Sequence, residues 1–244
     1  MIKKRNTIDL SLILPCYNES EHIQKSIPRI ISILENSKHS YELILIDDKS
    51  TDNTTTLIKK LSKQNPKIHM YFHDKNQGRG ATVTEGLQIA RGEVAGFIDI
   101  DLEVSPVYIP EIVSALKNNI ADVIVGQRHY PFSFFPINHL MRFLSTKIYS
   151  FIAKNVLELP IQDTESGYKF FNRKKVLKVL SKVKDKHWFW DTEIIAQSTI
   201  EDLLVKEIPV LFLRNQNKTS TVKLLSDTVK YLIALHHFKQ SIKK

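Results

Sequence analysis

The sequence predicts an α/β fold in which helices flank both faces of a mostly parallel sheet. The first observation is that short apolar runs alternate with amphipathic helical segments between residues 8 and 125, a pattern typical of βαβ units. The second is that polar clusters follow these apolar runs. Ligands bind at the carboxyl ends of the strands in such sheets, so the same pattern predicts a binding edge. A chain of 244 residues, of which 42% are hydrophobic, can bury a core of this size.

The elements of the first half follow from hydrophobic spacing and from turn residues. Strands are expected at residues 8–14, 41–46, 68–72, 95–98 and 122–125. An apolar helical pattern runs to about residue 36, and we place Pro28 in its first turn, where a missing N–H costs little. Asp52 is expected to cap a second helix. A third helix follows the glycines at positions 78 and 80, and a fourth spans residues 107–117.

The pattern changes after residue 130, where an aromatic and proline-rich segment leads into the second half. Helices are expected at about 138–157, 173–182 and 221–238, and strands at the end of 162–172 and at 205–213. Asp191 can cap a further helix and could equally face a substrate. The apolar stripe of 138–157 indicates packing against a core. A lysine-bearing amphipathic helix can also lie in a membrane interface, and that remains the second interpretation.

Three acidic residues follow the strand expected at 95–98. Asp99 and Asp101 emerge on the same side of an extended chain, and Glu103 joins them if the chain stays extended. Because unpaired buried carboxylates are costly, three of them at a strand end indicate a cation. Oxygen ligands suit Mg²⁺ or Mn²⁺, which are commonly shared with substrate phosphates. A bare acidic pair recurs by chance, so its place in the fold decides its meaning.

Five polar segments follow strands and are expected to converge on one edge of the sheet. They are residues 15–19, 47–48, 74–80, 99–103 and 126–128. Gly78 and Gly80 open a helix whose N–H groups and dipole favour an anion such as a diphosphate, and Arg79 adds a cation. Residues 15–20 contain no glycine. This disfavours a hydride-transfer enzyme, whose glycine fingerprint follows the first strand.

The formal charge of +9 has a local origin, because residues 169–186 contain eight Lys or Arg residues and one acid, Asp185. Such a face can serve nucleic acid, anionic lipid or a phosphorylated substrate, or it can confer solubility alone. The single cysteine, Cys16, excludes an internal disulfide and fits a reducing compartment. We recognise no signal peptide and no run of eighteen apolar residues, so membrane contact would be peripheral.

Four segments of the first half resemble the signatures of a known family. They are PCYNE at 15–19, DDKSTDNT at 47–54, NQGRG at 76–80 and DID at 99–101. Their order and spacing are similar to those of inverting, GT-A-fold glycosyltransferases of family 2. The resemblance implies a Rossmann-like sheet with a C-terminal acceptor-side segment. Residues 1–130 would form the nucleotide-sugar-binding half, and residues 131–244 the acceptor-side half with amphipathic helices, of a single continuous domain.

The second half resembles a narrower branch, the polyprenyl- and dolichyl-phosphate hexosyltransferases. The resemblance is carried by GQR at 126–128, Arg142, DTESGYK at 163–169, WDTE at 190–193 and EIPV at 207–210. The DTESGYK and WDTE segments look closer to those of the dolichyl-phosphate β-glucosyltransferases than to those of the mannose synthases. Gln127 and Thr82 depart from the family pattern, in which smaller residues are common at these positions.

The resemblance implies a role for each segment at the binding edge. The nucleotide-sugar would contact Pro15, Tyr17, Glu19, Asp47, Asp48, Arg79 and Asp99, with Arg79 facing the diphosphate. A Mg²⁺ or Mn²⁺ ion would be held by Asp99, Asp101 and Glu103 and would neutralise charge on the leaving nucleotide diphosphate. The acceptor phosphate would bind Arg128, Arg142 and Lys169, since Arg in particular suits phosphate.

The acceptor decides whether the reaction needs a general base. A phosphate monoester is already ionised near neutral pH, because its second pKa is about 6. If the acceptor were instead a sugar hydroxyl, a carboxylate would have to take its proton, and Asp163 or Asp191 would be the candidates. The expected catalytic residues are therefore Asp99, Asp101, Asp163 and Asp191.

The sequence thus predicts a metal-dependent inverting transferase that moves a hexose, glucose from UDP-glucose, onto a polyprenyl or dolichyl phosphate. It would act at the cytoplasmic face of a membrane, with peripheral contact. The first alternative is a family 2 transferase that uses GDP-mannose or another nucleotide-sugar, or that acts on a glycan hydroxyl. The distant alternative is a non-catalytic nucleotide- or nucleic-acid-binding module. No nucleic acid is expected as partner, because no base-reading motif accompanies the basic residues.

Overall fold

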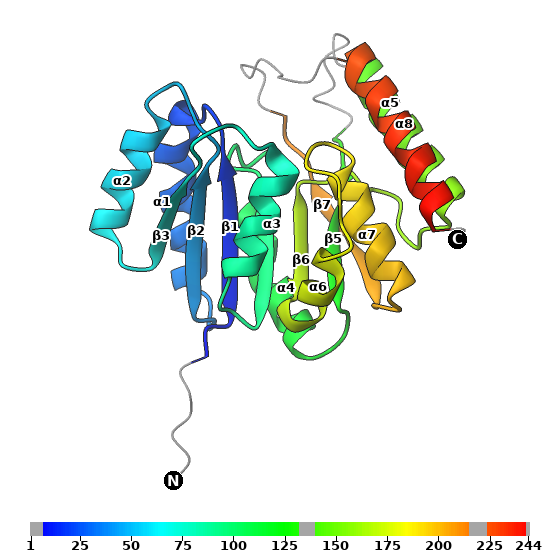
Figure 1. Ribbon diagram of the computed structural model, residues 1–244. Helices are drawn as coiled ribbons and strands as arrows, with labels where there is room; N and C mark the ends of the chain where they lie inside the picture. The colour runs from blue at the N-terminus through cyan, green and yellow to red at the C-terminus, as the bar shows by residue number, and fades with distance from the viewer. Residues whose placement is uncertain (1–6, 132–139, 215–223, 243–244) are drawn as a thin grey trace.

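The computed structural model describes residues 7–131, 140–214 and 224–242, which form a central sheet covered by helices on both faces (Figure 1). The strands are β1 (Leu10–Cys16), β2 (Tyr41–Asp47), β3 (Ile68–Phe72), β4 (Val94–Ile98), β5 (Val123–His129), β6 (Tyr168–Asn172) and β7 (Val205–Leu211). In the described residues they form one seven-stranded sheet of order β3-β2-β1-β4-β6-β5-β7. Only the pairs that involve β6 are antiparallel. The predicted α/β class with a mostly parallel sheet is confirmed.

The helices also follow the expected order along the chain. They are α1 (Ser20–Glu35), α2 (Thr54–Gln64), α3 (Arg79–Ile89), α4 (Ile109–Lys117), α5 (Leu140–Leu157), α6 (Arg173–Leu180), α7 (Trp190–Ile200) and α8 (Leu224–Ser241), with a short 3-10 turn, η1 (Pro106–Tyr108), before α4. Asp52 is not the N-cap of α2, because that position is held by Asn53, whose side chain makes no capping bond. Asp52 lies one residue earlier, and its Oδ1 accepts a hydrogen bond from the Thr54 N–H at 2.9 Å. None of the helices in the described ranges has the length and apolarity that crossing a bilayer requires.

Pro28 corrects one prediction, because it lies in the middle of α1 and not in its first turn. The helix begins earlier than expected, at Ser20, where Asp52 Oδ2 accepts from the Ser20 N–H at 3.1 Å. Its buried face is continuous across the proline, since Ile23, Ile27 and Ile30 are all fully buried. Burial of this face offsets the one backbone hydrogen bond that proline removes.

The sheet separates two apolar layers, and β1 shows how. Leu10, Leu12 and Leu14 pack with α1, α2 and α4 on one face, whereas Ile13 packs with α3, α6 and α7 on the other. Adjacent residues of a strand point to opposite faces of the sheet. A strand that is buried on both faces is therefore apolar at consecutive positions. A third cluster lies where α5 and α8 run side by side against α7 and is formed by Leu157, Leu159, Phe189, Ala196, Tyr231, Leu235 and Phe238.

The two predicted halves of the chain share this sheet. β6, from the second half, lies between β4 and β5, and β7 completes the edge beyond β5. The antiparallel register of β6 pairs its Tyr168 with Ile98 of β4, so the segment before β6 lies beside the end of β4. The Asp99 N–H donates to the Gly167 carbonyl at 3.2 Å. The second half thereby contributes directly to the edge at which β4 ends.

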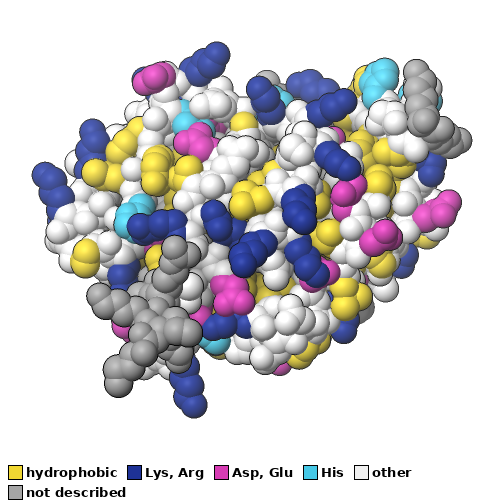
Figure 2. All heavy atoms as spheres, turned by 60° about the horizontal axis from the view of Figure 1, so that its bottom comes forward, with side chains coloured by type: hydrophobic (Ala, Val, Ile, Leu, Met, Phe, Trp, Pro, Cys, Tyr) yellow, Lys and Arg dark blue, Asp and Glu magenta, His cyan; other side chains and the backbone are white. Residues whose placement is uncertain are grey.

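The basic segment lies largely at the opposite edge of the sheet. Because β6 is antiparallel, it ends beside the start of β4, where the Arg173 N–H donates to the Glu93 carbonyl at 3.0 Å. Figure 2, which brings that end of the molecule forward, shows Lys and Arg side chains spread among acidic and apolar ones. Lys175, for example, pairs with Asp122 at 2.6 Å. The charges at the start of α6 therefore lie away from the polar edge, whereas Lys169 and Lys186 of the same segment lie close to it.

Candidate functional site

The polar segments that follow β1, β2 and β3 meet at one edge of the sheet, as expected. The Asp48 N–H donates to the Cys16 carbonyl at 2.8 Å, and the His73 N–H donates to the Asp47 carbonyl at 3.0 Å. Asn18 Oδ1 accepts from the Thr51 N–H at 2.7 Å. Tyr17 leaves 43% of its surface exposed at this edge. These contacts form one continuous polar edge, and Tyr17 is available to a ligand there.

Asp47 and Asp48 differ from the surface ligands that the resemblance implied, because both are almost fully buried. Asp47 accepts from the Ser50 N–H at 3.0 Å and from the Thr55 hydroxyl at 2.5 Å. Asp48 accepts from the N–H groups of Gln77 and Gly78 at 2.7 and 2.9 Å. Asp48 therefore bonds to the turn before α3, while its predicted contact with a nucleotide-sugar stays a prediction.

The glycines of this turn are explained by close packing. Gly78 has a φ of +94°, and a Cβ added there would lie 2.6 Å from the Lys186 carbonyl oxygen. A Cβ on Gly80 would lie 2.6 Å from Trp190 Cβ. The Gly78 N–H is already bonded to Asp48. The N–H groups of Gln77 and Gly78 before this helix are thus taken by a carboxylate of the protein itself, and the glycines allow residues 186–190 to approach.

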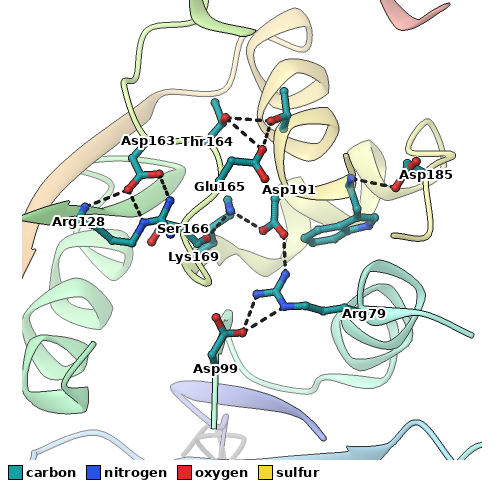
Figure 3. A network of polar contacts seen from close by, with 12 residues as sticks. Arg79, Asp99, Arg128, Asp163, Thr164, Glu165, Ser166, Lys169, Asp185 and Asp191 are labelled. Atoms are coloured by element: carbon teal, nitrogen blue, oxygen red, sulfur yellow. Dashed lines mark hydrogen bonds and ion pairs between the residues drawn. The ribbon is translucent and has the colours of Figure 1, made fainter. Parts of the chain in front are cut away.

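Arg79 links two acidic residues at the centre of the edge (Figure 3). Its Nε and Nη2 atoms donate to Asp99 Oδ1 at 3.1 and 2.8 Å, and its Nη1 donates to Asp191 Oδ2 at 2.5 Å. Asp99 keeps 46% of its side chain exposed, whereas Asp191 keeps only 4%. Asp191, the second residue of α7, does not cap that helix. The buried Asp191 thus fixes the guanidinium on one side, while the other side pairs with Asp99, whose carboxylate is half-exposed to solvent.

Lys169 supports Asp191 from the interior. Its ammonium donates to Asp191 Oδ1 at 2.5 Å and to the Ser166 carbonyl at 2.5 Å, and the residue is fully buried. Desolvation by burial lowers the pKa of Lys169 although Asp191 favours its charged form. Lys169 is predicted to hold an acceptor phosphate, but in this structure its ammonium is buried and bonds to Asp191 and the Ser166 carbonyl.

Gly167 permits the second half to approach Asp99. A Cβ added to Gly167 would lie 1.8 Å from Asp99 Oδ2 and 2.8 Å from Arg79 Nη2. No side chain larger than hydrogen fits there without displacing the Asp99 carboxylate. The glycine in the segment DTESGYK is therefore required by the close approach of two segments that are far apart in the sequence.

The three acids that follow β4, Asp99, Asp101 and Glu103, do not form a complete metal site. The chain turns after Ile98, with Leu102 at φ +53°, so the extended geometry that would bring Glu103 beside Asp99 and Asp101 is absent. Asp101 Oδ1 accepts from the Glu103 N–H at 3.2 Å. No three His, Cys, Asp or Glu side chains within the described ranges are grouped closely enough to hold a metal. Carboxylates such as the half-exposed Asp99 still fit an ion that takes its other ligands from substrate phosphates.

Arg128 and Asp163 form a buried ion pair. Arg128 donates from Nε and Nη2 to the two Asp163 oxygens, both at 2.7 Å, and its guanidinium stacks over the Phe212 ring. Burial would raise the pKa of Asp163, but the adjacent guanidinium brings it below its ordinary value. The third predicted phosphate ligand, Arg142, lies in α5 with its side chain outside the described part of the structure.

Glu165 is a site residue that sequence reasoning missed. Its Oε1 accepts from the Thr192 hydroxyl at 2.6 Å, and the same hydroxyl lies 2.7 Å from Tyr231 of α8. Desolvation, followed by the nearby charge of Asp191, raises the pKa of Glu165 to about 7. The segment DTESGYK contains this carboxylate, but spacing alone does not show which of its acids lies against Asp191.

Comparison with known proteins adds an independent line of evidence. A family model described as "Glycosyl transferase family 2" matches residues 11–180. The chain is 26% identical over 205 residues to "Glycosyltransferase AglD" of Haloferax volcanii, which covers 83% of this chain and 33% of that protein. It is 27% identical over 246 residues to "Dolichyl-phosphate beta-glucosyltransferase" of Saccharomyces cerevisiae, with 91% and 72% covered. The chain therefore spans about a third of the first relative and most of the second.

Solved structures resemble the fold over almost the whole chain. Glucosyl-3-phosphoglycerate synthase from Mycobacterium tuberculosis, crystallised with Mn²⁺, UDP and glucosyl-3-phosphoglycerate, gives a TM-score of 0.70 at 17% identity and covers 95% of this chain and 80% of that one. TarS of S. aureus, in complex with UDP-GlcNAc, gives 0.61 at 13% identity, with 93% and 65% covered. At these identities the likeness concerns the fold.

Proposed function

The chain belongs to glycosyl transferase family 2, and on that premise we propose that it moves glucose from UDP-glucose onto a polyprenyl or dolichyl phosphate with inversion. It has the GT-A fold of its structural neighbours and is a nucleotide-sugar-dependent transferase. The choice of donor and acceptor is supported by relatives named dolichyl-phosphate beta-glucosyltransferases in yeast and in Trichomonas vaginalis. UDP in the structures of the glucosyl-3-phosphoglycerate synthase supports the same donor class.

The observation that carries the proposed acceptor is the pairing of both predicted bases. Asp191 accepts hydrogen bonds from Arg79 and Lys169, and Asp163 accepts two from Nε and Nη2 of Arg128. A carboxylate that is fixed by cations is a poor proton acceptor. A phosphate monoester arrives already ionised, so an acceptor of this class needs neither carboxylate as a base.

The geometry of Arg79 and Asp99 supports the donor side of the proposal. Arg79, anchored on Asp191, would donate to the diphosphate of the nucleotide-sugar, which would compete with Asp99 for the Nε and Nη2 donors. A divalent cation, when bound at Asp99 and Asp101, would supply Lewis-acid neutralisation of the leaving diphosphate. An acceptor oxygen would attack the anomeric carbon from the face opposite the departing nucleotide, so the configuration inverts. UDP and the lipid-linked sugar are the products.

The pair α5 and α8 supports an approach to a lipid surface. Ile148 and Phe151 of α5 are 53% and 69% exposed, and Val229 and Ile233 of α8 are 56% and 51% exposed. The opposite sides of both helices pack in the cluster around Tyr231 and Leu235. Both interpretations of the amphipathic helix at 138–157 are therefore supported, core packing on one side and a membrane interface on the other.

Glu165 favours a second candidate acceptor, a glycan hydroxyl. Its pKa of about 7 suits a general base. Under this alternative Glu165 would take the hydroxyl proton as the new glycosidic bond forms. The same network of Thr192 and Tyr231 would hold it in place.

A transfer assay tests both candidates. The purified protein is incubated with Mn²⁺ and radiolabelled UDP-glucose, with either a polyprenyl phosphate or a panel of saccharides as acceptor, and GDP-mannose is run in parallel. The proposal expects a lipid-linked glucose from UDP-glucose. It fails if no lipid-linked sugar forms from any of the donors. Glu165→Gln separates the candidates, because transfer to a lipid phosphate survives this change and transfer to a hydroxyl does not.

A further inference from the structure

His73 lies at the end of β3 with only 4% of its side chain exposed, and the site described above does not use it. Its Nδ1 is 2.6 Å from Asp48 Oδ1, and its Nε2 is 2.9 Å from Glu85 Oε2 on α3. A neutral imidazole carries one N–H, whereas the imidazolium carries two. A ring with a carboxylate at each nitrogen is therefore satisfied only in its charged form.

The energetics of the ring agree with this geometry. Burial lowers the pKa of His73, but the hydrogen bonds to Asp48 and Glu85 outweigh it and bring the pKa above its ordinary value of 6.5. The charged groups that contact the ring within the described ranges are these two carboxylates, one from the end of β2 and one from α3. Glu85 is 37% exposed and Asp48 is 5% exposed, so Asp48 depends more on its partner.

Asp48 connects His73 to the turn that carries Arg79. Its carboxylate receives His73 together with the backbone N–H groups of Gln77 and Gly78, and its backbone carbonyl accepts from Asn76 Nδ2 at 3.1 Å. Gly78 is the residue with φ +94°, and α3 begins at the next residue, Arg79. The conformation of this turn, which a glycine at positive φ permits, thus depends on a buried carboxylate whose compensating charge is His73.

We propose that His73 is a positioning residue, which in its imidazolium form holds Asp48 against the 76–78 turn and so presents Arg79 to the diphosphate of a nucleotide-sugar. The inference rests on the proposed function only in taking a nucleoside diphosphate sugar as the ligand at Arg79. His73 would thus help to align Arg79, the side chain proposed to bind the diphosphate, although His73 itself lies outside the reacting centre. It also makes donor affinity sensitive to pH.

The direction in which donor affinity changes with pH follows from the proposal that the imidazolium form of His73 is the one that positions Arg79. Donor affinity is highest where His73 is protonated and falls as pH rises through a pKa that lies above 6.5. UDP-glucose is the probe of choice, because its diphosphate is a diester without an ionisation near neutral pH, unlike that of UDP. The contribution of His73 to donor affinity is the difference between two pH profiles of UDP-glucose binding, that of the wild type and that of a variant without the imidazole.

Two amide substitutions separate the two contacts of the ring. The amide nitrogen in His73→Asn can reach Asp48, as Nδ1 does, whereas that in His73→Gln can reach Glu85, as Nε2 does. Binding of UDP-glucose with Mg²⁺ is measured by calorimetry between about pH 5.5 and 8.5. Exchange of the Gln77 and Gly78 amide protons is followed by NMR without ligand. His69→Gln is the matched control, because His69 lies on β3, the strand that precedes His73, 3.4 Å from Glu42 and away from this turn.

His73→Gln is expected to weaken UDP-glucose binding about tenfold at the acid end, to flatten the pH profile and to speed exchange at Gln77 and Gly78. His73→Asn should stay within about threefold of the wild type and also lose the pH dependence. His69→Gln should change neither. Wild-type affinity and exchange in His73→Gln would overturn the proposal.

Two further outcomes keep the test decisive. If the His73 variants do not fold, Glu85→Gln at the exposed end of the ring should move the fall in affinity to lower pH, and an unmoved midpoint would overturn the proposal. If the wild type binds no UDP-glucose at any pH, the proposed donor is wrong. The positioning role is then tested by amide exchange alone: faster exchange of Gln77 and Gly78 in His73→Gln supports it, and unchanged exchange overturns it.

Discussion

The ammonium nitrogen of Lys169 lies 2.5 Å from Oδ1 of Asp191, and both side chains are buried, with 0% and 4% exposed. The other oxygen of Asp191 receives Arg79 at 2.5 Å. One buried carboxylate therefore joins a cation of the interior to the cation at the surface of the site. The network decides which charges remain available to a ligand, and four predictions follow from it and from its neighbours.

Replacing Lys169 with methionine should unfold the protein more easily. The change removes one cation from the buried Asp191 and leaves part of its charge uncompensated, which costs about 3–5 kcal/mol. Urea denaturation monitored by circular dichroism measures the loss. Lys175→Met is the control, because its pair with Asp122 leaves the lysine 49% exposed, and about 1 kcal/mol or less is expected. Similar losses in the two variants would contradict the buried role of Lys169.

Asp99→Asn should abolish transfer while leaving the fold intact. The amide keeps the size of the side chain and can still accept from Arg79, but it no longer offers a charge to a cation shared with the diphosphate. A loss of about 100-fold or more in turnover is expected. Calorimetry should show a melting temperature within about 2 °C of the wild type. Asp74→Asn, at an exposed position of the same edge, serves as control, and full activity of Asp99→Asn would remove the centre of the proposed mechanism.

Gly167→Ala should inactivate the enzyme by displacing Asp99. The added methyl would lie 1.8 Å from Asp99 Oδ2, so the carboxylate and Arg79 must both move. Gly126→Ala makes a matched control, since the atoms nearest to its methyl would belong to Val210 and Tyr168, at 3.0 Å or more. Steady-state transfer rates, with circular dichroism to verify folding, compare the two variants. Retained activity in Gly167→Ala would show that this close approach does not position Asp99.

Glu165→Gln should change how stability depends on pH. In the folded protein the pKa of Glu165 is raised from 4.5 to about 7, mainly by burial. The folded state therefore binds the proton more tightly than the unfolded state, and this residue's contribution to stability falls as pH rises from 4.5 to 7. The variant should lose that fall and be more stable than the wild type above pH 7 by about 2 kcal/mol. Chemical denaturation at a series of pH values measures it, and parallel curves would contradict the raised pKa.

The order of strands and helices could be predicted from the sequence because each depends on local periodicity. β3 spans the expected residues 68–72, and β4 and β6 lie close to their expected positions. The polar segments after β1 to β4 could be placed at one edge because parallel strands end together. Pro28 was misplaced, since the apolar face of α1 extends through a residue that usually marks a boundary.

The partners of the charged side chains could not be predicted in the same way. Lys169 and Arg128 read as phosphate ligands in the sequence, and the structure gives them buried carboxylates as partners. Arg79 and Asp191 are 112 residues apart. No spacing rule covers such a pair, because the contact depends on how α3 and α7 pack on the same face of the sheet.

The sequence by itself therefore determined the fold class, the polar edge and the family, because alternation of apolar segments and short motifs are local properties of the chain. Only the tertiary structure decided which charges meet. The antiparallel insertion of β6 between β4 and β5 brings Gly167 onto Asp99 and Lys169 beneath Asp191. Because a buried charge takes its partner from whatever the packing brings within reach, the roles of Lys169, Asp48 and Glu165 follow from that packing.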